Sequence, residues 1–163
     1  MSMFTTDLTQ RAARLIERLR EKNYTLATAE SCTGGLIGAL ITSISGASDI
    51  YTHGFITYAN VAKEGMIGVP HALLEMHGAV SEPVACAMAE GAQRVAGSSV
   101  AVSVTGIAGP GGGSPEKPVG LVHLACAGPR GTQHAQHLFT GDRDAVRLHA
   151  VHAAIVLIEA QLA

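Results

Sequence analysis

The sequence predicts an α/β protein in which helices cover a mixed β-sheet. Short uncharged runs rich in β-branched residues alternate with helix-like segments along most of the chain, as in sheets whose parallel strands are joined by helices. Late in the chain, two such runs follow one another across the turn "GPRG", which indicates an antiparallel hairpin. A sheet with both parallel and antiparallel strands accounts for both observations.

Hydrophobic periodicity predicts the first four elements. Residues 7–22 place apolar side chains at helical spacing, with charged side chains on the opposite face, and predict an amphipathic helix. The run "YTLATA" (24–29) predicts a buried strand, and "GGLIGALITSI" (34–44) predicts a buried helix. The run "DIYTHGFITYA" (49–59) predicts a second strand.

Three helices are predicted next. "NVAKEGMIGV" (60–69) predicts a short helix that ends at a glycine, and "PHALLEMHG" (70–78) predicts another. Ser81 is the predicted N-cap of a longer helix, "EPVACAMAEGAQRVA" (82–96), because the early proline of this segment suits a first helical turn.

The last third of the chain completes the sheet. "SVAVSVTG" (99–106) has a strong strand pattern. "VGLVHLACAG" (119–128) and "TQHAQHLFT" (132–140) are the predicted strands of the hairpin. Residues 142–162 predict a closing amphipathic helix with Asp142 as its cap.

The composition fits one globular domain over residues 1–163. Hydrophobic residues make up 47% of the chain and charged residues 15%, which is enough apolar material for a substantial core. Because aromatic residues make up only 4%, this core must consist mainly of Ala, Val, Leu and Ile side chains. The net charge of -2 and the scattered basic residues exclude the electrostatic footprint of a nucleic-acid-binding protein.

The sequence also favours a cytoplasmic protein without membrane association. The N-terminal segment is charged throughout and lacks the apolar core of a signal peptide, and no window has the character of a membrane span. The cysteines Cys32, Cys86 and Cys126 form an odd, sparse set without metal-binding spacing. Such a set fits a reducing compartment better than a disulfide scaffold.

The stretch "ATAESCTGG" (27–35) is the first candidate site. If the strand ends within it, Ser31 and Thr33 lie at the carboxyl edge of the sheet, where open α/β sheets bind ligands. The backbone N–H groups of Thr33, Gly34 and Gly35 would then be available to an anion or an oxyanion. The alternative is that Ser31 or Thr33 only caps the following helix.

The stretch "TYANVAK" (57–63) is the second candidate site. With Asn60 as the N-cap, Lys63 becomes the third helical residue, where a cation opposes the helix dipole. That dipole, together with partial burial, would lower the pKa of Lys63. A neutral lysine can deprotonate a serine, and the Tyr58 hydroxyl can relay or hold the proton. The alternative is an exposed lysine beside a core tyrosine.

The glycine-rich segment "GIAGPGGGSPEKPVG" (106–120) is the third candidate site. It is not a P-loop, since Lys117 is followed by proline rather than by serine or threonine. It predicts either an anion-binding nest or flexible lid, or a long surface connection.

Cys32 is a rival nucleophile to its neighbour Ser31, since a helix N-terminus favours a thiolate.

The histidines do not predict a metal site. His134 and His137 lie three apart on a predicted strand and would face opposite sides of the sheet. His149 and His152 share one face of the closing helix, but the sequence offers them no third ligand nearby.

Five blocks of the sequence together closely resemble one known family. They are "TAESCTGGLIGALIT", "GFITYANVAKEGMIGV", "HGAVSEPVACAMAEGA", "VSVTGIAGPGGGSPEKPVGLVHLA" and "FTGDRDAVR". The family that they resemble is the CinA C-terminal domain family. The blocks occur in the family's order and cover the chain from about residue 8 to its end.

The resemblance implies a fold and a reaction. The implied fold is a three-layer α/β/α sandwich with a mixed sheet of about five strands, assembled into a homo-oligomer. Characterised members are nicotinamide-mononucleotide amidohydrolases. The implied reaction therefore converts this small-molecule nucleotide to nicotinic acid mononucleotide and ammonia in pyridine nucleotide recycling, without a metal or other cofactor. Many members carry a further N-terminal nucleotide-processing domain, which we expect this chain to lack.

The resemblance also assigns catalytic residues. The family's serine falls on Ser31, its tyrosine on Tyr58 and its lysine on Lys63, and the threonine of the "TGIAGP" block falls on Thr105. The implied mechanism is a serine–lysine hydrolysis, in which Lys63 takes the proton from Ser31 with help from Tyr58 and Ser31 attacks the carboxamide.

The predicted substrate-binding residues form two groups. The N–H groups of residues 33–35 are the predicted oxyanion donors, and Thr105, Gly106 and Gly109 are predicted to line the nucleotide pocket. Arg143 is a candidate phosphate ligand, with a surface arginine near a helix start as the alternative. Two other functions stay open: a non-catalytic nucleotide-binding or partner-docking module, and an amidase or esterase of another substrate.

Overall fold

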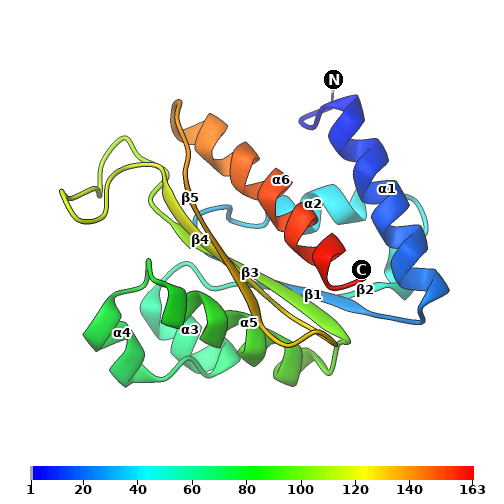
Figure 1. The fold of residues 1–163 in the computed structure, drawn as a ribbon, viewed down its shortest axis with the longest axis horizontal. Coiled ribbons are helices and arrows are strands. Elements are labelled where there is room, and N and C mark those ends of the chain that lie inside the picture. The colour runs from blue at the N-terminus through cyan, green and yellow to red at the C-terminus, as the bar shows by residue number, and fades with distance from the viewer. Residues whose placement is uncertain (1) are drawn as a thin grey trace.

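A computed structural model describes residues 2–163, and its elements follow the predicted order (Figure 1). The elements are α1 (Thr6–Glu21), β1 (Leu26–Glu30), α2 (Leu36–Thr42), the short 3-10 helix η1 (Ala47–Asp49), β2 (Tyr51–Ile56), α3 (Asn60–Ile67), α4 (His71–His77), α5 (Glu82–Ala96), β3 (Val100–Gly106), β4 (Leu121–Ala127), β5 (Gln133–Leu138) and α6 (Arg143–Ala160). Each predicted helix and strand is present, and η1 is the one element of the described chain that was not predicted.

The strands form one mixed sheet in the order β2-β1-β3-β4-β5. Strand β1 runs parallel to both β2 and β3, whereas β4 pairs antiparallel with β3 and with β5. The predicted hairpin is therefore confirmed. In the register of the sheet, Glu30 lies level with Ile56 and Val104, so the carboxyl ends of the parallel strands meet at one edge.

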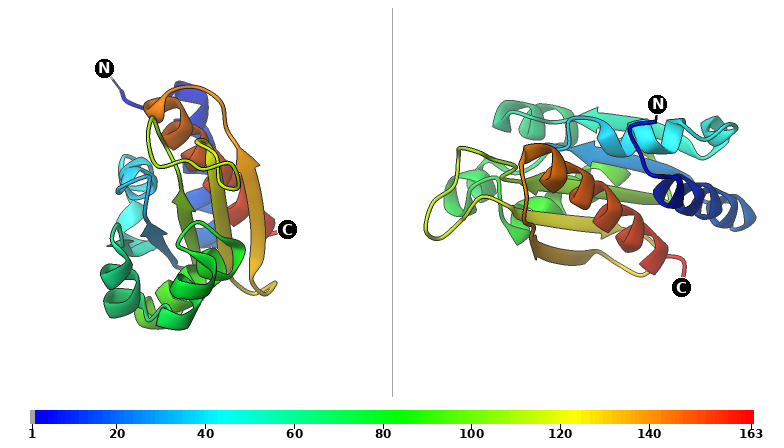
Figure 2. Two further views of the ribbon diagram at one scale, coloured as in Figure 1. Left: turned by 90° about the vertical axis from the view of Figure 1, so that its left-hand side faces the viewer. Right: turned by 90° about the horizontal axis from the view of Figure 1, so that it is seen from above.

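Helices cover both faces of the sheet, which confirms the three-layer α/β/α sandwich (Figure 1; Figure 2). Helices α1, α2 and α6 lie on one face, and α3, α4 and α5 lie on the other. The core on the first face includes Leu15, Leu40 and Ile155, and the core on the second includes Ile67 and Met88. Both are built mostly from aliphatic side chains, as the low aromatic content predicts. Burying each large aliphatic side chain contributes about 1.5–3 kcal/mol.

One glycine sets the position of α3 against α5. A Cβ at Gly91 would overlap the carbonyl group of Ile67 at the end of α3, so only glycine lets the two helices touch there. This contact holds α3 beneath the edge of the sheet where β1, β2 and β3 end.

Among the helices of residues 2–163, none has the length and apolar character that crossing a membrane requires.

Candidate active site

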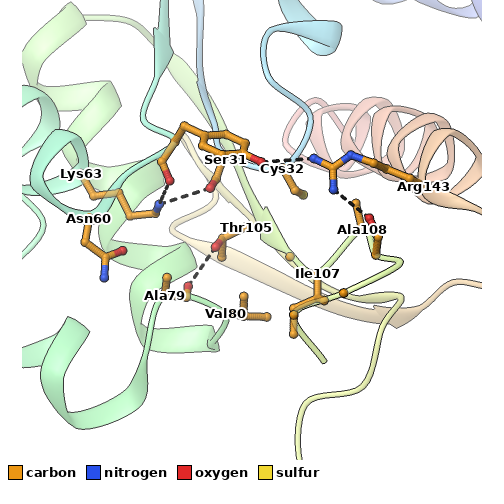
Figure 3. A pocket seen from close by; sticks show the side chains of 15 residues that line it. Ser31, Cys32, Asn60, Lys63, Ala79, Val80, Thr105, Ile107, Ala108 and Arg143 are labelled. Atoms are coloured by element: carbon orange, nitrogen blue, oxygen red, sulfur yellow. Dashed lines mark hydrogen bonds between the residues drawn. The ribbon is translucent and has the colours of Figure 1, made fainter. Parts of the chain in front are cut away.

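The three stretches singled out in the sequence converge at the carboxyl edge of the sheet. Residues 31–35 follow β1, residues 57–63 follow β2 and enter α3, and the glycine-rich segment follows β3. Together with the start of α6, they surround a cavity of about 280 Å³ (Figure 3). Adjacent parallel strands thus bring together side chains that lie far apart in the sequence.

Lys63 and Ser31 are in contact inside this cavity. The Lys63 Nζ atom lies 3.2 Å from Ser31 Oγ, and the two side chains point toward each other in Figure 3. The same nitrogen lies 2.9 Å from the carbonyl oxygen of Thr57 and 3.1 Å from that of Tyr58. Lys63 is 1% exposed, which excludes the alternative of a surface lysine.

The surroundings of Lys63 favour its neutral form. Burial lowers the pKa of the Lys63 ammonium group below its ordinary value. None of the ion pairs in residues 2–163 involves this amine. In the neutral form, the two N–H bonds of the Lys63 amine are directed to the carbonyls of Thr57 and Tyr58, which can only accept hydrogen bonds. In that form the lone pair is left for the hydroxyl of Ser31, as a general base requires.

The predicted N-cap of α3 is wrong. Ala59 occupies the N-cap position, no side chain caps the helix, and Asn60 lines the cavity instead. Lys63 is therefore the fourth helical residue rather than the third, and its own N–H already donates to the Ala59 carbonyl at 3.2 Å. The lowered pKa of Lys63 thus follows from burial, not from an exposed helix dipole.

A buried carboxylate caps α2. The N-cap position is occupied by Gly35, which has no side chain and a left-handed φ of 103°. The Glu30 carboxylate instead accepts hydrogen bonds from the N–H groups of Ile37 at 2.8 Å and Gly38 at 3.0 Å. It also accepts a hydrogen bond from the Thr33 hydroxyl at 2.7 Å. Glu30 therefore ties the turn at residues 31–35 to the start of α2.

The alternative that Ser31 or Thr33 merely caps α2 is wrong. Neither hydroxyl accepts a helix N–H, because Glu30 takes that role. The Ser31 hydroxyl is therefore not used in capping the helix, and it contacts Lys63.

Replacing the capping carboxylate should destabilise the protein. In Glu30→Gln the amide NH₂ group would face backbone N–H donors, so we expect the free energy of unfolding to fall by about 2 kcal/mol. Urea unfolding of the variant measures this loss. Glu21→Gln is the matched control, since Glu21 is exposed at the end of α1. An equal stability of both variants would contradict the capping role.

The backbone N–H groups of the turn differ in availability. The Gly34 N–H donates to the Ser31 carbonyl at 3.0 Å and is used within the turn. The N–H groups of Cys32, Thr33 and Gly35 donate to no backbone carbonyl in the described chain. Of the residues that carry these three groups, only Cys32 lines the cavity, and the predicted donors at residues 33–35 do not.

Tyr58 and Arg143 line the cavity and contact each other. Arg143 Nη1 donates to the Gly109 carbonyl at 2.8 Å, and Nη2 donates to the Tyr58 hydroxyl at 3.1 Å. The Tyr58 hydroxyl thus contacts Arg143, and it is the Tyr58 carbonyl that contacts Lys63. Tyr58 is 60% exposed, so it is not the core tyrosine of the alternative interpretation.

The cavity carries a positive charge at Arg143. Arg143 lines it together with the Lys63 amine, and no acidic side chain of residues 2–163 does. Such a cavity favours a ligand that carries negative charge.

The end of β3 forms the floor of the cavity. Thr105 and Gly106 of β3 line it, and so does Gly109 in the loop that follows; their role in binding a nucleotide stays a prediction. The Thr105 hydroxyl donates to the Ala79 carbonyl at 2.9 Å and so ties β3 to the turn before α5. A Cβ at Gly106 would lie 2.7 Å from a side-chain carbon of Val122, so glycine is required there.

Cys32 is poorly suited to act as the nucleophile. Burial raises the pKa of its thiol to about 11, so the thiol is protonated near neutral pH.

The histidines form no ligand set: within residues 2–163, no three His, Cys, Asp or Glu side chains are grouped to hold a metal ion.

Two residues near the site were not predicted to belong to it. Asn60 was expected only to cap a helix, and Arg147 donates to backbone carbonyls of the turn at residues 31–35. The four-residue spacing of Arg143 and Arg147 on a predicted helix was the available signal, since such residues share a face.

Comparisons with known proteins show the family to which the chain is similar. A family model for the CinA C-terminal domain matches residues 8–162. A CinA-like protein of Anaeromyxobacter dehalogenans is 53% identical over 148 residues, which cover 91% of this chain and 36% of that protein. A CinA-like protein of Syntrophobacter fumaroxidans is 54% identical over 142 residues, which cover 87% of this chain and 34% of that protein. The chain thus spans about a third of the length of these curated relatives.

Solved structures match over nearly their whole length. The crystal structure of a competence/damage inducible protein, CihA, from Agrobacterium tumefaciens has a TM-score of 0.96 and 44% identity, covering 99% of each chain. The competence damage-inducible protein A (ComA) from Klebsiella pneumoniae has a TM-score of 0.91 and 32% identity, covering 95% of this chain and 96% of that one.

Proposed function

Because the chain belongs to the CinA C-terminal domain family, we propose that it hydrolyses the carboxamide of nicotinamide mononucleotide to nicotinic acid mononucleotide and ammonia. The observation that carries the proposal is the buried Lys63 amine, held 3.2 Å from Ser31 Oγ by two backbone carbonyls. A serine hydroxyl beside a neutral amine is an activated nucleophile without further groups.

The proposed mechanism has two halves. Ser31 Oγ attacks the carboxamide carbon while neutral Lys63 takes its proton, which forms a tetrahedral intermediate. The Lys63 ammonium then protonates the carboxamide nitrogen of the intermediate, so that ammonia leaves and an acyl-enzyme remains. Water attacks the acyl-enzyme as Lys63 again accepts a proton, and the return of that proton to Ser31 releases the carboxylic acid. Amide and water are thus converted to acid and ammonia, and no cofactor is needed.

The oxyanion of the intermediate requires hydrogen-bond donors beside Ser31. The Cys32 N–H is the candidate that the geometry favours, because Cys32 lines the cavity and its N–H has no backbone acceptor in residues 2–163. Each such donor contributes about 3–4 kcal/mol to transition-state stabilisation in a comparable hydrolase. Thr33 follows directly and is the second candidate.

Arg143 supports a phosphorylated substrate. Besides the Lys63 amine, Arg143 is the only basic side chain of the described residues that lines the cavity, and its contacts to Tyr58 and Gly109 hold it there. A guanidinium group binds phosphate through paired N–H donors. We therefore assign binding of the nucleotide phosphate to Arg143, whose side chain is oriented by Tyr58.

Homo-oligomer formation and a role in nucleotide recycling stay predictions.

An assay of ammonia release from nicotinamide mononucleotide and from nicotinamide riboside tests this assignment. In Arg143→Gln, KM for the mononucleotide should rise by about 10- to 100-fold, because a charge-assisted hydrogen bond is lost. KM for the riboside, which has no phosphate, should not change.

Arg130→Gln is the matched control, since the hydrogen bond of the Arg130 side chain in the described residues goes to the Ala163 carbonyl at the chain end. Binding of the mononucleotide by the wild-type protein without turnover at any pH would instead favour a non-catalytic module. Turnover of other amides alone would favour a different substrate.

A further inference from the structure

Helix α6 contacts the nucleophile turn, residues 31–35, through one arginine. Arg147 Nε donates to the Cys32 carbonyl at 3.2 Å, and Nη2 donates to the Thr33 carbonyl at 3.1 Å. The side chain is 27% exposed and does not line the cavity. Arg147 therefore reaches the turn from outside the substrate pocket.

The chemistry of this contact requires an arginine. The planar guanidinium presents several N–H donors in a fixed fork, so one side chain can hold two successive carbonyls. A lysine offers a single nitrogen and cannot reproduce this geometry. The other partner of Arg147 is Asp144, 3.7 Å away and 84% exposed, and a pair in that setting contributes little.

The two carbonyls belong to the peptide groups that follow Ser31. The Cys32 carbonyl shares its peptide group with the Thr33 N–H, and the Thr33 carbonyl shares its group with the Gly34 N–H. The Gly34 N–H in turn donates to the Ser31 carbonyl and closes the turn. A hydrogen bond to a carbonyl polarises its amide and strengthens the N–H as a donor.

The charge of Arg147 also reaches the turn. Burial raises the pKa of the Cys32 thiol, and the positive charge of Arg147 acts in the opposite direction. The guanidinium therefore favours negative charge beside Ser31. An oxyanion formed by attack of Ser31 would be stabilised in the same sense.

We propose that Arg147 is a positioning residue of the active site, which holds the peptide groups after Ser31 and, through the hydrogen bond from the Gly34 N–H to the Ser31 carbonyl, strengthens the Cys32 N–H as an oxyanion donor. This role rests on the proposed function of Ser31 as the nucleophile. It assigns to α6 a part in the chemical step that is separate from substrate binding by Arg143.

Steady-state kinetics of Arg147→Met and Arg147→Lys test the proposal. We expect kcat to fall by about 100-fold in Arg147→Met, the cost of a small displacement of reacting groups. KM for nicotinamide mononucleotide should stay unchanged, because Arg147 does not line the cavity. Arg147→Lys keeps the charge but not the forked donors, so its kcat should lie between those of Arg147→Met and the wild-type protein. Arg94→Met is the matched control, since Arg94 also donates to a backbone carbonyl, that of Ile67.

Chemical rescue separates positioning from a general loss of structure. Guanidinium ion at a low, non-denaturing concentration should restore part of kcat in Arg147→Ala and should have no effect on Arg94→Ala. A folded Arg147→Met protein with wild-type kcat would overturn the proposal. So would a rise in KM at unchanged kcat, or a loss in Arg147→Ala that guanidinium does not reverse.

Labelling of Ser31 by a fluorophosphonate distinguishes this proposal from the choice of substrate. If wild-type protein is labelled at Ser31 but does not hydrolyse nicotinamide mononucleotide, the proposed substrate is wrong. Slower labelling of Arg147→Met would then still support the role of Arg147, and equal labelling would overturn it. Absence of labelling at Ser31 in wild-type protein would overturn both proposals.

Discussion

Ser31→Ala is expected to lower ammonia release from nicotinamide mononucleotide on the order of 10⁶-fold, as loss of the serine does in a comparable hydrolase. The Ser31 side chain makes one hydrogen bond in the described chain, to Lys63. Its removal leaves Lys63 with two carbonyl partners, so the melting temperature should change little. The measurement is the rate of ammonia release at saturating substrate, together with thermal unfolding.

Two further variants make the serine experiment decisive. Ser48→Ala is the matched control, because Ser48 is exposed in the short helix η1 and lies outside the cavity. Cys32→Ala separates the two adjacent candidates for the nucleophile. Retained activity in Ser31→Ala with loss in Cys32→Ala would move the nucleophile to Cys32, against the raised pKa of that thiol.

Lys63→Met should have the second largest effect, a loss of about 10⁴-fold in kcat, which is the upper range for one general base. Methionine keeps much of the volume of the buried side chain but has no basic nitrogen. Lys63→Arg should be as inactive as Lys63→Met, because a guanidinium is not deprotonated in proteins. The exposed Lys22→Met is the matched control.

The pH dependence of the wild-type rate follows from the same residue. Lys63 must be neutral to accept the proton of Ser31, so activity should rise with pH through the pKa of Lys63, which burial lowers. Lys63→Met should lack this ascending limb in its residual activity. An unchanged pH–rate profile in the variant would show that another group acts as the base.

Stability should depend on pH through Lys63 as well. Between its lowered folded-state pKa and the ordinary lysine value of about 10.4, the unfolded chain binds more protons than the folded one. The free energy of unfolding therefore rises with pH across this window, and this contribution is lost as pH falls below it. Urea unfolding over a pH series should show the rise in wild-type protein and its absence in Lys63→Met.

The order of helices and strands was predictable because the buried strands are short aliphatic runs and the helices have clear apolar faces. Helix starts were less predictable. Asn60 has the side chain of an N-cap yet lines the cavity, and α2 is capped by Glu30, which precedes the helix by several residues. Sequence spacing reveals local caps, whereas a carboxylate that folds back from a strand acts through tertiary geometry.

The site was partly predictable for the same reason. Ser31 was visible because it follows a buried strand at the expected ligand-binding edge of the sheet, and Lys63 because a cation near a helix start opposes the helix dipole. The contact of Arg143 with Tyr58 and that of Arg147 with the nucleophile turn were not visible, because each joins segments separated by 85 residues or more.

The sequence by itself determined the α/β class, the order of the elements and the residue types available for chemistry, since periodicity and turn residues are local properties. Only the tertiary structure decided that Ser31 faces a buried amine rather than a helix N-terminus. It also decided that burial, and not an exposed helix dipole, lowers the pKa of Lys63. Burial and hydrogen-bond partners depend on which strands lie side by side, and that arrangement exists only in the folded chain.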